Sequence, residues 1–295
     1  MKNADYLEAY KDYLVEEEKS PRTIDSYMIH VKGFLEFINK DIKKVKRTDL
    51  NAYKEHLRGQ NLKASSINSK LVGVKQFIDF LNDRFELAIS ARVRQEKIQK
   101  QYTLKDEELL SEEDYRLLIQ AVEDNGDLRT KALFETMYFS GMRISEALQL
   151  RVDHVESGKR IIEDIKGKGG KYRDIYVSDK LLKSLRDYLR VRKQPARPDL
   201  SPNSPEHTDL LFVGERGPLS RQTAHNTMKK YAKIADIEAT KAHVHNLRHL
   251  FGLRLASKGV PIQDIAKYMG HTSIEVTKIY LEKPQSYYAS LIDEL

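Results

Sequence analysis

Residues 160–177 read RIIEDIKGKGGKYRDIYV and carry the clearest β pattern in the chain. Two segments rich in β-branched and aromatic residues flank the glycine-rich turn Gly167-Lys168-Gly169-Gly170-Lys171. This pattern predicts a β-hairpin with a basic tip. Because the sequence on both sides is patterned as helix, we expect a mainly α protein with one small β-sheet.

The residues around the hairpin are patterned as one mixed α/β domain. A capping box at Ser111-Glu112-Glu113-Asp114 opens its first helix. After the hairpin, helices are expected near residues 179–192, 220–235, 245–258, 261–269 and 273–281. We therefore predict a domain over residues 109–283, followed by a short tail at 284–295.

The first 91 residues are patterned as a small helical bundle. Apolar residues at helical spacing mark four helices, and Ser20-Pro21 is a typical start signal for the second. Short polar joints favour an up-and-down arrangement. Residues 92–108 are polar and highly charged, which indicates an interdomain linker.

The composition favours a polyanionic partner. The 295 residues carry a formal net charge of +7, and the first hundred hold 20 Lys and Arg against 15 Asp and Glu. Such a balance suits nucleic acid. The chain has no cysteine, which excludes disulfides, thiolate catalysis and cysteine zinc sites. No run approaches the roughly 20 apolar residues of a membrane span, and no secretory signal is evident, so we expect a cytoplasmic, nucleoid-associated protein without membrane contact.

Two basic features lie in the first half of the predicted second domain. Arg143 follows Gly141 just before an amphipathic helix, where backbone N–H groups and a guanidinium can face one anion. The hairpin tip carries Lys166, Lys168 and Lys171, which can reach a groove or a phosphate. Taken singly, each feature is more often an ordinary solvated surface.

The second half adds two further segments. His245 and Arg248 are three residues apart and share one helix face. His271 falls in a tight joint between two helices after Gly270, and Tyr280 falls near the end of the second. An isolated tyrosine is far more often a core or surface residue than a nucleophile, so the argument depends on the segments together.

In combination these residues suit attack on a phosphodiester. Arginines stabilise the negative charge that builds on the phosphate oxygens without a metal ion. A phenol with a pKa of about 10 can attack once its proton is removed, and a lysine can protonate the departing oxygen. We find no Walker A motif and no carboxylate cluster for two-metal catalysis, so we expect no cofactor and no metal.

Four segments, SGMRISEAL, IKGKGGKYRDIYV, HNLRH and GHTSIEVTKIY, resemble the tyrosine recombinases, the integrase family that includes the Xer-type enzymes. They occur in the family's order and at its approximate spacings. The resemblance covers residues 111–295 and extends more loosely to the N-terminal bundle. It implies a SAM-like core-binding domain followed by the family's catalytic domain.

The resemblance also implies a role for each matching residue. Arg143 and Arg248 match the two catalytic arginines. His245 matches the His or Lys before the second arginine, and His271 the His or Trp that precedes the nucleophile. Tyr280 matches the nucleophile itself, which would form a 3′-phosphotyrosyl bond.

Two further positions support these residues. Lys168 best matches the hairpin lysine, although Lys166 and Lys171 stay open as alternatives for the general acid. Glu146 matches an acidic position that orients the first arginine. Tyr287 and Tyr288 are rival nucleophiles of low weight, because they fall outside the segment that follows His271.

The implied activity is site-specific recombination of double-stranded DNA. The family works as a homotetramer on two sites with inverted-repeat arms and exchanges strands through a Holliday junction. Chromosome or plasmid dimer resolution, phage integration and transposition all stay open, as do an accessory protein and docking of the tail in cis or in trans. The alternatives are a type IB topoisomerase-like enzyme and a DNA-binding regulator without catalysis.

Overall fold

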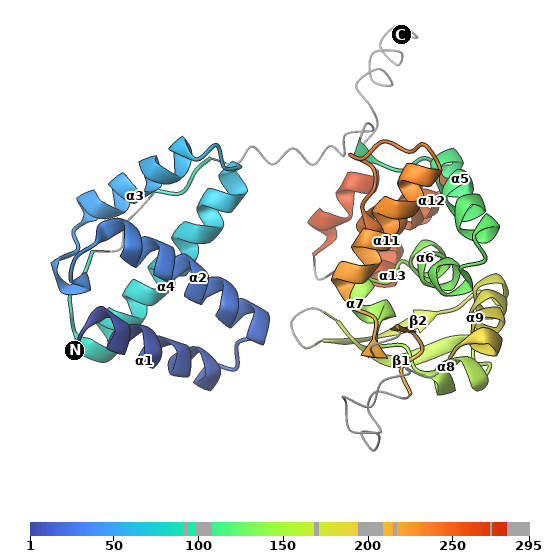
Figure 1. Ribbon diagram of the computed structural model, residues 1–295, viewed down its shortest axis with the longest axis horizontal. Coiled ribbons are helices and arrows are strands. Elements are labelled where there is room, and N and C mark those ends of the chain that lie inside the picture. The colour runs from blue at the N-terminus through green and yellow to red at the C-terminus, as the bar shows by residue number, and fades with distance from the viewer. Residues whose placement is uncertain are drawn as a thin grey trace, which may run out of the picture. The chain divides into compact units, whose positions relative to one another are not determined.

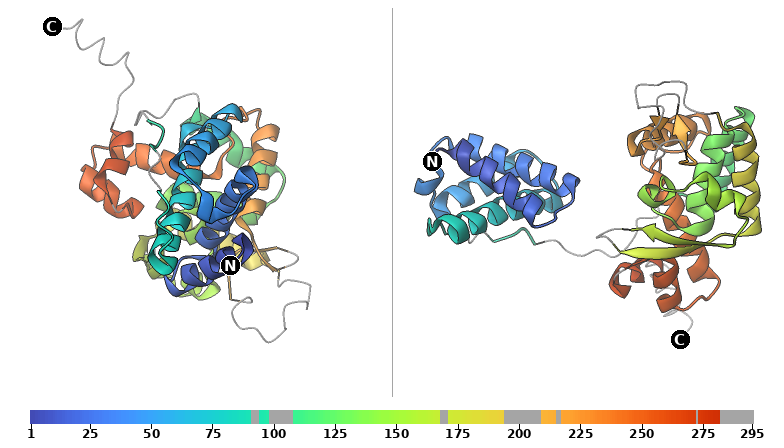
Figure 2. Two further views of the ribbon diagram at one scale, coloured as in Figure 1. Left: turned by 90° about the vertical axis from the view of Figure 1, so that its left-hand side faces the viewer. Right: turned by 90° about the horizontal axis from the view of Figure 1, so that it is seen from below.

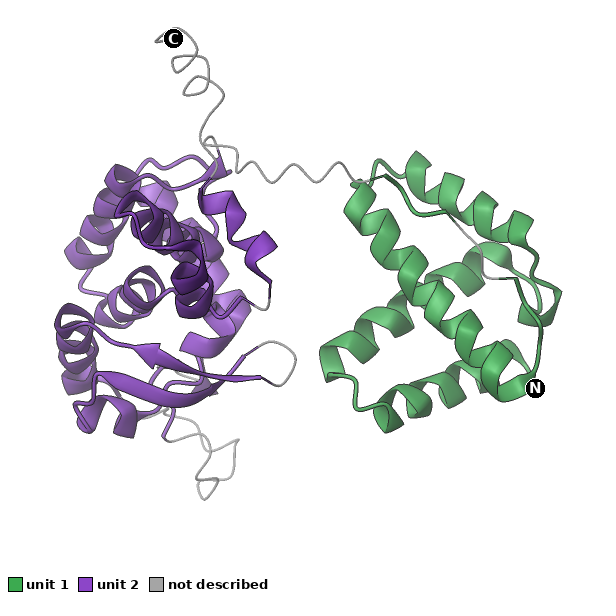
Figure 3. Ribbon diagram, turned by 180° about the vertical axis from the view of Figure 1, so that it is seen from behind, with its two compact units in different colours: residues 1–100 green, residues 101–295 purple. Residues whose placement is uncertain are grey.

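The computed structural model describes residues 1–90, 94–97, 108–167, 171–193, 209–214, 217–271 and 273–281. The chain divides into two compact units, residues 1–100 and 101–295, each with its own hydrophobic core (Figure 3). The predictions for Lys168, for the 284–295 tail and for the rival tyrosines lie outside the described residues. Within the described ranges, no helix has the length and apolar character needed to cross a membrane.

Unit 1 is helical, as its sequence pattern predicts. Its helices are α1 (Asn3–Glu16), α2 (Pro21–Ile38), α3 (Arg47–Gly59) and α4 (Ala64–Phe85), with a 3₁₀ turn η1 (Ile42–Lys44) before α3. Ser20 caps α2 by accepting a hydrogen bond from the backbone N–H of Thr23. Aromatic side chains, among them Tyr10, Phe34 and Phe77, fill the core.

The simple up-and-down arrangement predicted for unit 1 is wrong, because α2 and α4 cross one another (Figures 1 and 3). The physical reason lies at Gly73 of α4. A Cβ atom there would lie only 2.8 Å from Nδ1 of His30 on α2, so the missing side chain lets the two helices approach closely. The bundle is therefore two helix hairpins packed across each other.

Part of the segment predicted as a linker is held on unit 1. The backbone of Glu96 pairs with the side-chain amide of Asn68 on α4, with distances of 2.7 and 3.0 Å. The Glu96 carboxylate binds Arg58 and Lys54 of α3 at 2.8 and 3.0 Å. Residues 94–97 thus follow the surface of this unit.

In its described residues, unit 2 is a helical domain with two small sheets. Helices α5 (Glu112–Asp124), α6 (Leu128–Ser140), α7 (Ile144–Ala147) and α8 (Val152–Glu156) precede the hairpin of β1 (Ile161–Lys166) and β2 (Tyr172–Tyr176). Then follow α9 (Asp179–Val191), β3 (Val213–Gly214), β4 (Gly217–Pro218), α11 (Arg221–Ile234), α12 (Val244–Ser257) and α13 (Ile262–Met269). The predicted capping box between Ser111 and Asp114 is present at the start of α5.

The hairpin turns one arginine toward the interior. Along β2 and the residue after it, Arg173 alternates with Ile175 and Val177, so all three side chains face the same side, and both apolar ones are buried. A bulge between Ile162 and Ile165 of β1 keeps both of these residues inside. Figure 2 shows α13 lying along the hairpin, where the rings of Tyr176 and Tyr268 are in edge-to-face contact.

The helix predicted over residues 273–281 is wrong. The segment instead forms two 3₁₀ turns, η4 (Ile274–Val276) and η5 (Lys278–Tyr280). Its β-branched residues are poor helix formers. The hydroxyl of the buried Thr277 also forms a hydrogen bond of 2.8 Å with Nδ1 of His271, and this bond fixes the joint between the two turns.

Candidate active site

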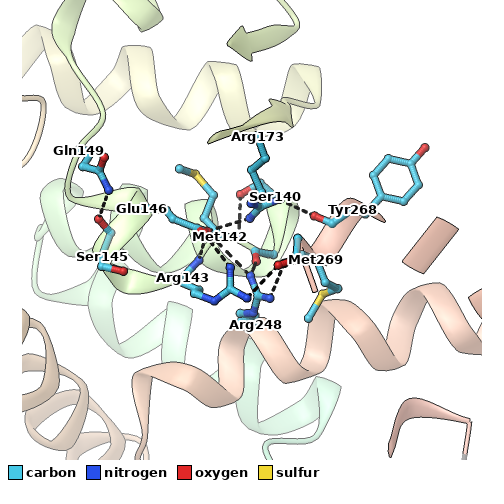
Figure 4. Close-up of polar contacts among 12 residues, drawn as sticks. Ser140, Met142, Arg143, Ser145, Glu146, Gln149, Arg173, Arg248, Tyr268 and Met269 are labelled. Atoms are coloured by element: carbon cyan, nitrogen blue, oxygen red, sulfur yellow. Dashed lines mark hydrogen bonds and ion pairs between the residues drawn. The ribbon is translucent and has the colours of Figure 1, made fainter. Parts of the chain in front are cut away.

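Glu146 of α7 lies at the centre of the site and is fully buried. Its carboxylate accepts hydrogen bonds from the Arg143 guanidinium at 2.8 Å, from the Arg143 backbone N–H at 2.7 Å and from Arg173 at 2.8 Å. Nη1 of Arg248 lies 3.9 Å away. Figure 4 shows the three arginines converging on this one carboxylate.

The charge state of Glu146 follows from these contacts. Burial alone would raise the pKa of its carboxyl, but the hydrogen bonds and positive charges of Arg173 and Arg143 outweigh burial and hold the pKa below its ordinary value. Glu146 is therefore a carboxylate at neutral pH. The cluster of Arg143, Glu146, Arg173 and Arg248, which we call the arginine cluster, keeps a net positive charge of two.

The end of α13 holds the same three arginines from the other side. Three consecutive carbonyls accept one hydrogen bond each: Tyr268 O from Arg173 at 2.6 Å, Met269 O from Arg248, and Gly270 O from Arg143 at 3.0 Å. The last carbonyls of a helix lack partners within the helix and lie at its negative end, so they suit cations. This contact also fixes the chain immediately before His271.

Arg248 is the most enclosed of the three arginines in the arginine cluster, with 1% of its surface exposed. Besides Met269 O, it donates to the carbonyl of Gly141 at the end of α6. Burial, then the charge of Arg143, lowers the pKa of Arg248 to about 9, and Glu146 opposes this shift. The guanidinium therefore stays protonated at neutral pH and adds positive potential from beneath Arg143.

Two glycines allow this packing. Gly141 and Gly270 end α6 and α13 with φ of 63° and 61°, a left-handed conformation that favours glycine. A Cβ atom on Gly141 would collide with the ring of Phe251, and one on Gly270 with the Arg173 side chain. The carbonyls of both glycines consequently reach the arginines.

Three histidines line the same region. His245 is exposed, whereas His249 and His271 are half-buried. Burial, followed by neighbouring positive charges that include Arg248, lowers the pKa of His245 and His271 to about 4 and that of His249 to about 3. All three imidazoles are neutral at pH 7.

Tyr280 packs into a pocket beside the histidines and is 4% exposed. Its ring lies parallel to His271 with the centroids 6.3 Å apart, and it rests on the backbone of α12 at Gly252. The hydroxyl is 3.1 Å from Nδ1 of His249. Burial raises the pKa of Tyr280 to about 12, although the charges of Arg248 and Arg143 pull it down.

The structure thus brings most of the predicted residues together. Arg143, Glu146 and Arg248 touch directly, His271 follows the helix end that binds them, and Tyr280 stacks on His271. The remaining predicted members are His245, which touches His249 edge to face, and Lys168, which lies outside the described residues. Its neighbour Gly167 is described, and a Cβ atom there would lie 3.3 Å from the Glu146 carboxylate.

Two residues of the site were missed by the sequence analysis. Arg173 could have been found from the alternation of β2, which places it on the face of Ile175 and Val177. His249 was quoted only as part of a motif, and no local signal marks it as the neighbour of Tyr280. No group of three potential metal ligands occurs in the parts of the chain that the structure describes.

Family models match both units. The model described as the phage integrase family matches residues 108–286, and the one described as the phage integrase N-terminal SAM-like domain matches residues 7–84. The structure agrees with this assignment, since it is mainly helical with small two-stranded sheets.

Curated relatives have the same character. The chain is 37% identical over 177 residues to the tyrosine recombinase XerD of Corynebacterium glutamicum, a match that covers 58% of this chain and 55% of that protein. It is 27% identical over 282 residues to a tyrosine recombinase of Thermosipho africanus, covering 93% of this chain and 94% of the relative. The chain thus spans about half the length of the first relative and nearly all of the second.

Solved structures share the fold. A XerH site-specific recombinase bound to a palindromic difH substrate matches with a TM-score of 0.71 and 22% identity, covering 92% of this chain and 80% of that one. A lambda integrase dimer bound to a core site matches with a TM-score of 0.72 and 16% identity, covering 96% of each chain. Because the family model spans more than half of the 295 residues, the chain belongs to the phage integrase family, the tyrosine recombinases.

Proposed function

We propose that the chain is a site-specific recombinase that cleaves and rejoins DNA through a 3′-phosphotyrosyl bond at Tyr280. The observation that supports this most is the convergence of Arg143 and Arg248 on one carboxylate and one helix end, with Tyr280 stacked on the histidine that follows that end. A preorganised positive site and a nucleophile are the two requirements for attack on a phosphodiester without a metal.

The arginine cluster would stabilise the charge that develops on the phosphate. Arg143 is the more accessible arginine of the predicted pair, with 23% of its side chain exposed. We propose that it binds the phosphate oxygens together with His245 and His271. The buried Arg248 would add positive charge from inside the protein. Because Glu146 and the end of α13 already fix the arginines, little reorganisation is needed when negative charge builds up on the phosphate.

The leaving 5′ oxygen needs a proton. We propose Lys168 as its donor, with Lys166 and Lys171 as the alternatives on the same hairpin. The position of Gly167 beside Glu146 supports this assignment, because it brings the base of the hairpin turn to the arginine cluster. The carbonyl of Lys166 is also held there, by the side chain of Gln149 at 2.9 Å.

Strand exchange requires more than one protomer. We propose that four copies act on two DNA sites through a Holliday junction, and that residues 284–295 of one copy dock on the next. The related XerH and lambda integrase structures, which contain DNA, support a DNA-bound assembly. The biological role, whether dimer resolution, integration or transposition, follows from the DNA site.

The test is trapping of the covalent intermediate. A binding site is first selected from random duplexes, and a nick is then placed beside the scissile phosphate so that the cleaved strand diffuses away. Wild-type protein should give a protein–DNA adduct that survives denaturing electrophoresis, and Tyr280→Phe should give none. Tyr13→Phe, at a partly buried tyrosine packed against the core of unit 1, is the matched control and should react normally.

Two results would count against the proposal. Adduct formation by Tyr280→Phe would move the nucleophile elsewhere, with Tyr287 and Tyr288 as the first candidates. Relaxation of a plasmid that carries two selected sites, with no recombinant product, would favour a topoisomerase-like enzyme.

A further inference from the structure

We propose that His249 receives the proton of Tyr280 as the hydroxyl attacks the phosphate, an inference that rests on the proposed function. The other candidate on the same helix is His245, which precedes Arg248. The geometry points instead to the histidine one helical turn further along α12, which is the hydrogen-bond partner of the Tyr280 hydroxyl.

The contacts of the three histidines differ. Nδ1 of His249 lies 3.1 Å from the phenolic oxygen, within range of direct proton transfer. His271 stacks against the Tyr280 ring, and its Nδ1 is occupied by the hydroxyl of Thr277 at 2.8 Å. His245 touches His249 edge to face, with ring centroids 4.6 Å apart, and is itself exposed.

The surface of α12 aligns the Tyr280 hydroxyl, which donates the proton, with the His249 imidazole, which accepts it. His249 and Gly252 are three residues apart and therefore lie on one face of the helix. Since Gly252 has no side chain, the Tyr280 ring rests directly against the helix at that point; a Cβ atom would lie 2.7 Å from the ring. The hydroxyl, at the far end of the ring, then meets His249.

The charge state of the pair supports a proton acceptor. A phenol with a pKa of about 12 is almost entirely protonated at neutral pH, so it needs a partner to take the proton during attack. His249 is neutral because burial, together with repulsion from neighbouring groups that include the charged Arg248, lowers its pKa to about 3. Its neutral ring has one nitrogen free to accept.

Binding of DNA would strengthen His249 as a base. A phosphate bound at Arg143 brings negative charge that offsets the positive potential around His249, and this raises the pKa of the imidazole. The same anion disfavours a free phenolate. Transfer to His249 in step with attack is therefore preferred over ionisation of Tyr280 beforehand.

The complete step balances. The bond between the Tyr280 oxygen and phosphorus forms while the bond from phosphorus to the 5′ oxygen breaks. The phenolic proton moves to Nδ1 of His249, and the 5′ oxygen takes a proton from the hairpin lysine proposed above. Rejoining reverses both transfers, so protonated His249 returns its proton to the departing tyrosine.

The test separates proton transfer from placement of the ring. His249→Asn puts an amide close to the position of Nδ1, so it can still hold the Tyr280 hydroxyl but cannot take its proton. We expect adduct formation to slow by about 10²- to 10⁴-fold, with unchanged DNA affinity and unchanged thermal unfolding at pH 7.5. Adduct formation at the wild-type rate would overturn the proposal.

A matched control lies outside the site. Nδ1 of His154 accepts a hydrogen bond from the backbone N–H of Arg151, at 3.2 Å, near the start of α8. His154→Asn is the same chemical change at the same ring atom, and it should react like the wild type. A comparable slowing in both variants would mean that the effect is not specific to His249, and would overturn the proposal.

A substrate with sulfur in place of the 5′ bridging oxygen assigns the direction of the transfer. Its leaving group needs no proton, so this substrate should rescue Lys168→Ala but not His249→Asn. Rescue of His249→Asn would place the histidine on the leaving-group side and refute our assignment. If the wild-type protein forms the adduct and Tyr280→Phe does not, the proposed function stands, whatever the His249 variants do.

Discussion

The arginine cluster and the Tyr280 pocket are neighbours, but they are held in different ways. The arginine cluster combines a buried carboxylate with consecutive helix-end carbonyls, and its members come from α7 and the residue before it, from β2 and from α12. Tyr280 comes from a 3₁₀ turn and is held by neutral imidazoles, by the shape of α12 and by one hydrogen bond of 3.1 Å.

The difference matches the two tasks proposed above for the arginines and for Tyr280. Charges that stabilise a transition state are most useful when they are fixed in advance. A nucleophile has to give up its hydrogen bond in order to react, so it is better held by contacts that cost little to break. The comparison predicts that changes in the arginine cluster affect folding most, and that changes in the Tyr280 pocket affect reactivity most.

The largest effect on folding should come from Glu146→Gln. The amide has no charge to oppose the three arginines, and its NH₂ group would face a guanidinium. Removing one partner of a buried ion pair costs about 3–5 kcal/mol, so unit 2 should unfold at much lower urea concentration and form no adduct. Urea titration followed by circular dichroism measures this.

The control for that change is Glu113→Gln on α5. Glu113 is exposed and pairs with Arg116 on the same helix surface, at 2.5 Å. Loss of this ion pair should leave the urea midpoint unchanged, because exposed ion pairs contribute little to stability. Equal midpoints for Glu146→Gln and the wild type would show that the arginine cluster does not depend on its carboxylate.

Acid should act on the two regions in different pH ranges. His249 and His271 have folded pKa values of about 3 and 4, below the ordinary 6.5, so the unfolded chain takes up protons first. Their contribution to stability is complete above pH 6.5 and is lost as the pH falls toward these values. Glu146, with its lowered pKa, adds a loss only below about pH 4.5.

Urea midpoints measured between pH 7.5 and 5 isolate the histidine part. His249→Asn should remove about 2 kcal/mol of the wild-type pH dependence over this range, because 1.5 pH units of displaced titration correspond to about that energy. An unchanged slope would mean that His249 is charged in the folded protein. That result would show that burial and the neighbouring positive charges do not lower the pKa of His249.

Sequence patterns predicted the parts of the site that depend on local order. The alternation in β1 and β2 gave the hairpin, and the spacing of His245 and Arg248 gave their shared helix. Arg173 was missed although the alternation turns it inward, because a charged residue in a strand is usually exposed. Burying Arg173 becomes favourable only beside Glu146, which is 27 residues earlier in the chain.

The failures over residues 273–281 and at His249 have a common cause. Apolar spacing in the segment fits a helix, but the bond between Thr277 and His271 and the packing of Tyr280 on Gly252 select two 3₁₀ turns. The partner of His249 is 31 residues away. Tertiary contacts of this kind leave no periodic signal in a single sequence.

The smallest effect on stability, with a clear effect on reactivity, is expected for Gly252→Ala. The new methyl group would lie 2.7 Å from the Tyr280 ring, which has to shift. Overpacking costs about 1–3 kcal/mol, and the higher helix propensity of alanine returns up to about 1 kcal/mol. The net loss in urea stability should therefore be about 1–2 kcal/mol, while adduct formation falls more steeply because the hydroxyl moves away from His249.

Gly59→Ala, where a Cβ atom meets nothing within 4 Å, is the control for the effect of helix propensity alone. If Gly252→Ala lost stability but formed adduct at the wild-type rate, the pocket would contribute to folding rather than to alignment of the nucleophile, and the contrast with the arginine cluster would disappear.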